Sequence, residues 1–189
     1  MPMTLFINAC VRKDSRTRRL ADSVLSKLDG PVTELRLEDV EFEPTTEEYL
    51  ARRDRLIADG NFGDPMFDLA RQFAEADRIV IAAPYWDLSF PAILKEYFEK
   101  INVVGITFVY TPEGIPSGLC RAKELVYVAT AGGDYVPEEF GFGYVRALAQ
   151  AFYGIPEVRL VQAKGLDIYG ADPEMILREA AGMPPATND

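Results

Sequence analysis

The segment from Cys10 to Arg19 reverses the sign of the charge in a chain whose formal net charge is −10, because five of the eight residues from position 12 onward are basic. Ser15 and Thr17 add hydroxyl groups, and each could cap a helix that starts here. Hydroxyls, a guanidinium such as that of Arg16, and the free amides of a helix N-terminus are groups that bind phosphate. The segment therefore predicts a site for a phosphate monoester, although a capped helix with a basic exposed face would have the same composition.

An aromatic loop occupies positions 84–88, directly after the apolar run Ile79–Ala83, which is typical of a buried parallel strand. The loop consists of Pro84, Tyr85, Trp86, Asp87 and Leu88. Tyrosine and tryptophan in an exposed turn indicate a flat apolar ligand, and the alternative is packing against the rest of the domain or against a subunit partner. A helix is expected to follow, capped by Ser89 and with Pro91 in its first turn.

A third loop, Thr130–Tyr135, contains the consecutive glycines Gly132 and Gly133. Without side chains, these residues let backbone amides approach a ligand closely, although a plain turn would use the same pair. The loop gains significance only in combination with the other two.

The hydrophobic pattern provides a scaffold that would bring the three loops together. Strands are expected at 4–9, 32–37, 79–83, 124–129 and 158–163. Helices are expected at 16–28, 46–58, 66–76, 140–153 and 173–181, in addition to the one after Ser89, with a short extended piece at 107–111 and a turn-rich loop at 112–118. This alternation predicts a doubly wound α/β fold with a five-stranded parallel sheet in the order 2-1-3-4-5. All three loops then lie at the carboxyl edge of the sheet, where ligands bind in open parallel sheets.

Composition narrows the classes of function. The chain has no histidine, so it lacks the usual general base of serine and cysteine hydrolases and the commonest transition-metal ligand, and no metal site is expected. The first loop lacks the glycines of a Walker or dinucleotide-binding motif, which disfavours ATP and a Rossmann-bound nicotinamide. The negative charge disfavours nucleic acid, and no segment approaches the ~20 apolar residues of a membrane span.

Two isolated cysteines, Cys10 and Cys120, form no CxxC pair and are typical of a protein in a reducing cytoplasm. At 189 residues, the chain is most simply one domain. That domain is expected to span residues 1–181, with 182–189 as a frayed tail.

The stretch IVIAAPYWDLSFPAILKEYFEKINVVGITFVYTPEGIPSG, followed by ATAGGDY, resembles the FMN-dependent NADH azoreductase and NAD(P)H:quinone reductase family of flavodoxin-like proteins. In that family, a serine-rich loop after the first strand holds the FMN phosphate, and two further loops contact the isoalloxazine ring. The resemblance places Ser15, Arg16 and Thr17 at the phosphate. It places the ring between the segment from Ala82 to Leu88 and the small-residue loop of Thr130, Ala131, Gly132 and Gly133, with Tyr135 as a further candidate lining residue.

Two positions depart from the family's residues. Ala9 stands where the family has an early serine of the phosphate site, and Asp87 stands where it has an asparagine. An ionised carboxylate can only accept a hydrogen bond, for example from flavin N3–H, and its charge opposes the negative charge that a flavin gains on reduction. These departures affect the expected redox potential and substrate range more than the expected cofactor.

The resemblance implies an FMN-dependent oxidoreductase, expected as a homodimer, that passes hydride from NADH or NADPH through the flavin to quinones or azo compounds. A ping-pong mechanism is expected, because donor and acceptor would use one exposed ring face in turn. Backbone amides from Trp86 to Leu88 and of Gly132 and Gly133 are expected at the polar edge of the ring. Two alternatives remain open, namely a flavodoxin-like electron carrier between protein partners and a flavin-less binding module of the same fold.

Overall fold

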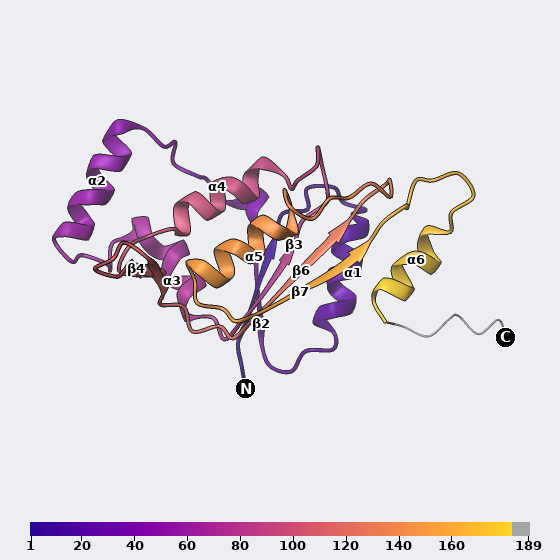
Figure 1. Cartoon of the computed structure of the whole chain (residues 1–189), viewed down its shortest axis with the longest axis horizontal. Helices are drawn as coiled ribbons and strands as arrows, with labels where there is room; N and C mark the ends of the chain where they lie inside the picture. The colour runs from indigo at the N-terminus through magenta and orange to yellow at the C-terminus, as the bar shows by residue number, and fades with distance from the viewer. Residues whose placement is uncertain (183–189) are drawn as a thin grey trace.

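A computed structural model describes residues 1–182 of the chain, which form a five-stranded sheet with helices on both faces (Figure 1). The sheet consists of β1 (Thr4–Asn8), β2 (Val32–Arg36), β3 (Arg78–Ala82), β6 (Glu124–Thr130) and β7 (Glu157–Ala163). All neighbouring strands are parallel, and their order is β2-β1-β3-β6-β7. The doubly wound α/β prediction and the order 2-1-3-4-5 are therefore confirmed, once the two strands outside this sheet are set aside.

Alternate side chains of the central strands point to opposite faces of the sheet. In β3, Ile79 and Ile81 belong to the larger core cluster, whereas Val80 and Ala82 belong to the smaller one, and all four are fully buried. The larger cluster includes residues of α3 (Asp68–Glu75), α4 (Ala92–Ile101) and α5 (Phe142–Ala151), and the smaller one residues of α1 (Arg16–Leu25) and α6 (Pro173–Ala180). Burial on both faces explains why this strand is a continuous apolar run.

Several helices begin or end at other residues than the pattern predicted. The helix expected to reach residue 28 ends at Leu25, because the amides of Lys27 and Leu28 bond to carbonyls three residues back and tighten the last turn. The helix expected at 66–76 is divided into a 3₁₀ turn, η2 (Pro65–Phe67), and α3. The remaining elements before β3 are η1 (Leu37–Asp39) and α2 (Glu47–Ala58). No helix within residues 1–182 is long and apolar enough to cross a membrane.

The prediction that Ser89 caps the next helix is wrong. The N-cap position of α4 is Pro91, which makes no side-chain cap hydrogen bond. The Ser89 hydroxyl instead donates to the carbonyl of Phe140 at 2.6 Å, so it ties the loop after β3 to the segment before α5.

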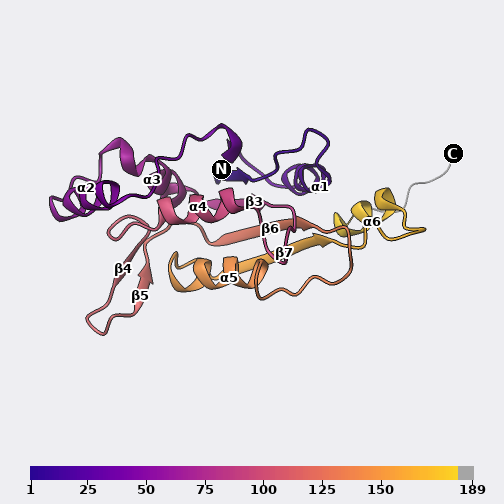
Figure 2. The ribbon, with the colours of Figure 1, turned by 90° about the horizontal axis from the view of Figure 1, so that it is seen from above.

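The segment expected as an extended piece and a loop is an antiparallel hairpin of β4 (Phe108–Tyr110) and β5 (Pro116–Gly118). It projects from one end of the molecule, away from the carboxyl edge of the large sheet (Figure 2). The sequence did not reveal β5 because proline and glycine are depleted in strands. At Gly118, a Cβ atom would lie 2.1 Å from the amide nitrogen of Gly154, so the hairpin needs glycine where it meets the chain after α5.

Candidate functional site

A cavity of about 270 Å³ lies at the carboxyl edge of the sheet, among the loops that follow β1, β3 and β6. Nine of the residues predicted from the sequence line it, namely Ser15, Arg16, Thr17, Pro84, Tyr85, Trp86, Thr130, Ala131 and Gly132. The sequence-based analysis missed five further lining residues, which are Cys10, Val11, Arg12, Asp14 and Asp167. Four of these belong to the basic loop already singled out, so only Asp167 had no signal in the sequence.

The other predicted residues do not line this cavity. They are Ala9, Asp87, Leu88, Gly133 and Tyr135. Ala9 is buried in the core, and its amide donates to the carbonyl of Ala82 at 2.9 Å, so it lies behind the cavity wall. Tyr135 is 80% exposed and extends into solvent. Asp87 and Leu88 form the tip of the loop after β3, and a Cβ atom at Gly133 would meet nothing within 4 Å.

The N-terminus of α1 forms one wall of the cavity. Ser15 is the N-cap, and its hydroxyl oxygen accepts from the amide of Arg18 at 3.2 Å, which confirms its predicted capping role. Thr17 is not a cap, because it lies inside the first turn and its hydroxyl pairs with that of Thr130 at 2.6 Å. The first amides of a helix have no acceptor within it, and the first turn of α1 carries no acidic residue. This wall is therefore suited to a phosphate or another anion.

Asp167 joins this wall to the loops after β6 and β7. Its carboxylate accepts from the Arg16 guanidinium at 2.8 Å, and its amide donates to the carbonyl of Gly132 at 2.9 Å. Arg16 also donates to the carbonyl of Leu166 at 3.2 Å. A Cβ atom at Gly132 would lie 2.2 Å from Asp167 Oδ2, so the carboxylate occupies its position only because residue 132 has no side chain.

The loop after β3 contains a two-residue turn with both central residues in the left-handed region. The φ angles of Asp87 and Leu88 are 49° and 68°. Trp86 and Ser89 exchange backbone hydrogen bonds across them, at 3.0 and 2.8 Å. This is the pattern of a type I′ turn, which ordinarily uses Asn-Gly or Asp-Gly. The amide of Trp86 thus already donates to Ser89, and the expectation that it would bind the edge of a ring is wrong. The amides of Asp87 and Leu88, by contrast, have no acceptor among the described residues.

Replacing Leu88 by glycine should raise the free energy of unfolding by about 1 kcal/mol, because the left-handed conformation costs an ordinary residue roughly that amount. Urea denaturation of the wild type and the variant measures the change. Leu119, which is 46% exposed against 45% for Leu88, provides the matched control. It has no positive φ, so Leu119→Gly should lower stability. Destabilisation by both substitutions would show that the turn stores no strain at Leu88.

Two side chains at the cavity that could become nucleophiles on losing a proton, Cys10 and Tyr85, are held in their neutral forms. Burial raises the pKa of the Cys10 thiol above its ordinary value. Desolvation raises the pKa of Tyr85, and the nearby Tyr135 and Glu139 add to this effect. Neither side chain is thus prepared to act as an anionic nucleophile. Within residues 1–182, no cluster of cysteine and carboxylate side chains could hold a metal ion.

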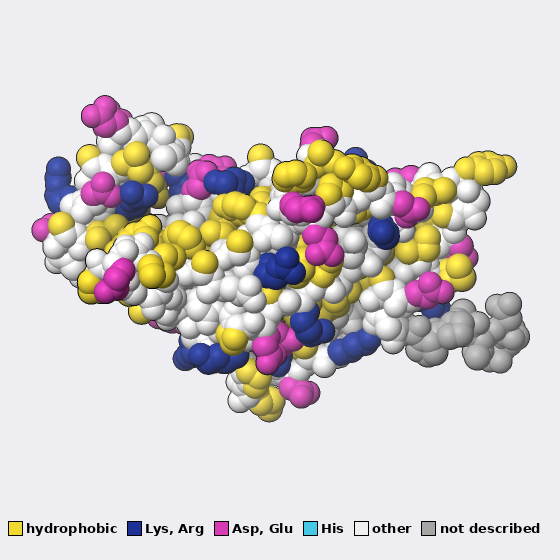
Figure 3. Space-filling model, viewed as in Figure 1, with side chains coloured by type: hydrophobic (Ala, Val, Ile, Leu, Met, Phe, Trp, Pro, Cys, Tyr) yellow, Lys and Arg dark blue, Asp and Glu magenta, His cyan; other side chains and the backbone are white. Residues whose placement is uncertain are grey.

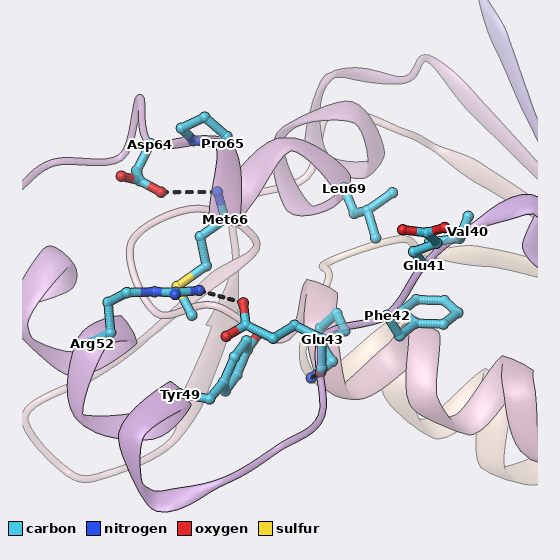
Figure 4. Close-up of a pocket in the computed structure, with 11 residues that line it drawn as sticks. Val40, Glu41, Phe42, Glu43, Tyr49, Arg52, Asp64, Pro65, Met66 and Leu69 are labelled. Atoms are coloured by element: carbon cyan, nitrogen blue, oxygen red, sulfur yellow. Dashed lines mark hydrogen bonds and ion pairs between the residues drawn. The ribbon is translucent and has the colours of Figure 1, made fainter.

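A larger cavity, about 630 Å³, lies away from this edge, between α2, η2 and the connection after η1 (Figure 4). Four of its five charged side chains already have partners within the protein. Arg52 binds Glu43, and the buried Lys100 ammonium donates to the Glu43 carbonyl at 2.5 Å and lies 3.9 Å from the centre of the Tyr49 ring. Asp64 accepts from the amide of Met66 (Figure 4). Because these contacts occupy most of its charged groups, and because the residues predicted from the sequence meet at the smaller cavity, we regard the smaller cavity as the candidate functional site.

Comparisons with known proteins show which family the chain belongs to. Residues 2–182 match the family model described as flavodoxin-like fold. FMN-dependent NADH:quinone oxidoreductase 2 of Clostridium acetobutylicum is 38% identical over 94% of each chain. The match to the FMN-dependent NADH:quinone oxidoreductase of Lachnoclostridium phytofermentans is 47% identical but covers only 58% of this chain and 56% of that protein.

Among solved structures, azoreductase from Bacillus anthracis is similar, with a TM-score of 0.80 at 27% identity over 96% of this chain and 98% of that chain. The resemblance to azoreductases and quinone reductases is therefore confirmed. The chain belongs to the family of flavodoxin-like proteins.

Proposed function

We propose that this protein is an FMN-dependent oxidoreductase that transfers hydride from NADH or NADPH to a quinone or an azo compound. The proposal is carried by one observation: an anion-binding helix N-terminus, an aromatic loop and a small-residue loop meet at one cavity in a flavodoxin-like chain. Relatives named as FMN-dependent NADH:quinone oxidoreductases and azoreductases support it.

The residues at the cavity fit the parts of FMN. The Ser15 hydroxyl and the first amides of α1 would hold the phosphate, and Arg12 lines the same cavity without a carboxylate partner among the described residues. The volume of the cavity, about 270 Å³, is slightly below the roughly 300–1,000 Å³ typical of ligand pockets. The planar flavin ring would therefore extend beyond the cavity, along more exposed surface.

Trp86, which is 37% exposed, would cover that ring. The amides of Asp87, Leu88, Gly132 and Gly133 would donate to its polar edge. When bound, the flavin supplies the redox chemistry, and the protein binds and orients both the flavin and its substrates.

A second copy of the chain is the proposed partner. Large apolar side chains next to the cavity are exposed to solvent, among them Leu88 at 45%, Tyr135 at 80% and Phe140 at 58%. Apolar side chains also gather over the loops after β3 and β6 in the space-filling view (Figure 3). A homodimer would cover part of this surface, and sedimentation equilibrium should then give twice the 21.1 kDa of the chain. The unpaired, buried Cys10 and Cys120 support the proposal that the protein works in the reducing cytoplasm.

The purified protein loaded with FMN is expected to reduce a simple benzoquinone with NADH or NADPH by ping-pong kinetics. Initial rates would be measured with donor and quinone both varied, and double-reciprocal plots should give parallel lines. The same protein stripped of FMN is the control, and adding FMN back should restore activity. Intersecting lines would contradict a shared face for the two substrates, and inactivity with every donor would contradict the proposed function.

A further inference from the structure

A basic cavity of about 550 Å³ adjoins the candidate site on the other side of the loop after β1. The two cavities share Cys10, Val11 and Arg12 as wall residues. Four cationic side chains line the basic cavity against two carboxylates, in a chain whose net charge is −10. The cations are Arg12, Lys13, Arg18 and Arg36.

Two of these cations have no counter-charge. The Arg18 guanidinium binds Asp22 at 2.8 Å and also Glu34, and Arg36 pairs with Glu38. Among residues 1–182, by contrast, no carboxylate lies within ion-pair distance of Arg12 or Lys13. Adjacent cations repel one another, so an anionic ligand between them would be favoured.

We propose that this basic cavity binds the phosphate groups on the adenosine side of the reduced nicotinamide dinucleotide. The inference rests on the proposed function, because it assigns the electron donor of that same reaction to a place on the protein. Arg36 is the last residue of β2, and its side chain lines the basic cavity together with Lys13. Guanidinium and ammonium groups bind such phosphates through charge-assisted hydrogen bonds.

The closeness of the two cavities supports this choice of ligand. The donor must reach the flavin with its nicotinamide while its other end lies elsewhere, and only the loop residues Cys10–Arg12 separate the proposed flavin cavity from the basic one. The loop lacks the glycines that would let backbone amides hold a pyrophosphate, so side-chain cations are the groups available here.

Lys13 allows a clean test, because it lines the basic cavity and not the candidate flavin site. Lys13→Gln should raise KM for NADPH about fivefold, since an exposed ion pair contributes up to about that factor, and Lys13→Glu should raise it further. KM for NADH should rise less, because NADH has no 2′-phosphate, and reduced nicotinamide mononucleotide should show no comparable rise. Lys123 is exposed just before β6, at the opposite edge of the sheet. Lys123→Gln and Lys123→Glu are therefore matched controls, which should leave KM unchanged for NADPH, NADH and reduced nicotinamide mononucleotide.

A titration that does not depend on turnover completes the test. Adenosine 2′,5′-bisphosphate should bind the wild-type protein in calorimetry, and Lys13→Glu should weaken it by about tenfold or more, with a smaller difference at high salt. Equal binding of the bisphosphate by the wild type and by Lys13→Glu would overturn the proposal. Inorganic phosphate that binds as tightly as the bisphosphate would also overturn it, because that result would indicate a general anion site. If quinone reduction fails with every donor, the proposed function fails, and the titration still decides whether the basic cavity binds this ligand.

Discussion

Replacing Ser15 and Thr17 together by alanine is expected to weaken FMN binding by on the order of a hundredfold, and riboflavin binding much less. Only FMN carries the phosphate that these hydroxyls are proposed to hold, and each hydrogen bond to a charged group contributes roughly 1.5–3 kcal/mol. The Ser15 oxygen accepts from Arg18, which leaves its proton free to donate. The hydroxyls of Thr17 and Thr130 use one proton between them, so the other remains for the ligand.

The measurement is the dissociation constant of each flavin, obtained by fluorescence titration. Loss of the Ser15 cap should also lower the stability of the protein by about 1 kcal/mol, which urea denaturation reports separately. Ser23→Ala with Ser26→Ala removes two hydroxyls near the other end of α1, where they bond only to backbone carbonyls, and serves as the control. Equal weakening of both flavins, or none, would mean that α1 does not hold the phosphate.

Gly132→Ala is expected to lower the free energy of unfolding by about 1–3 kcal/mol and to weaken FMN and riboflavin together. The new Cβ atom would lie 2.2 Å from Asp167 Oδ2 and 3.0 Å from its Cγ. The backbone of Asp167 is held in place, because its amide donates to the Gly132 carbonyl. To make room, the Asp167 side chain must therefore rotate and release Arg16. Urea denaturation and flavin titration would measure the two effects.

The neighbouring Gly133 provides a control that separates a steric clash at residue 132 from the general effect of replacing glycine by alanine in this loop. A Cβ atom at Gly133 would meet nothing within 4 Å, and its φ is not positive, so Gly133→Ala should leave stability nearly unchanged. Adding Asp167→Ala to Gly132→Ala should recover much of the lost stability, because the atoms in conflict are then gone. If Gly132→Ala were as stable as the wild type, the carboxylate of Asp167 would not be constrained as the structure shows.

The sequence by itself determined the architecture and most of the site. A continuous apolar run such as Ile79–Ala83 is typical of a strand buried on both faces, and alternating strands and helices allow few arrangements other than a doubly wound sheet. Because loops that follow parallel strands share one edge, the sequence also predicted that Ser15, Trp86 and Gly132 would lie at one cavity. These predictions depend on periodicity and chain direction, which are local properties of a sequence.

Only the tertiary structure decided the contacts between residues that are distant in sequence. Asp167 reaches the site because the loop after β7 hydrogen-bonds to the loop after β6, and no motif marks that pairing. Thr17 pairs with Thr130 across 113 positions rather than capping its own helix. Asp87 and Leu88 adopt a left-handed turn that suits aspartate but that leucine disfavours, so the surrounding fold must impose it at Leu88. In each case, long-range packing and hydrogen bonding outweigh the local preference on which a sequence-based prediction depends.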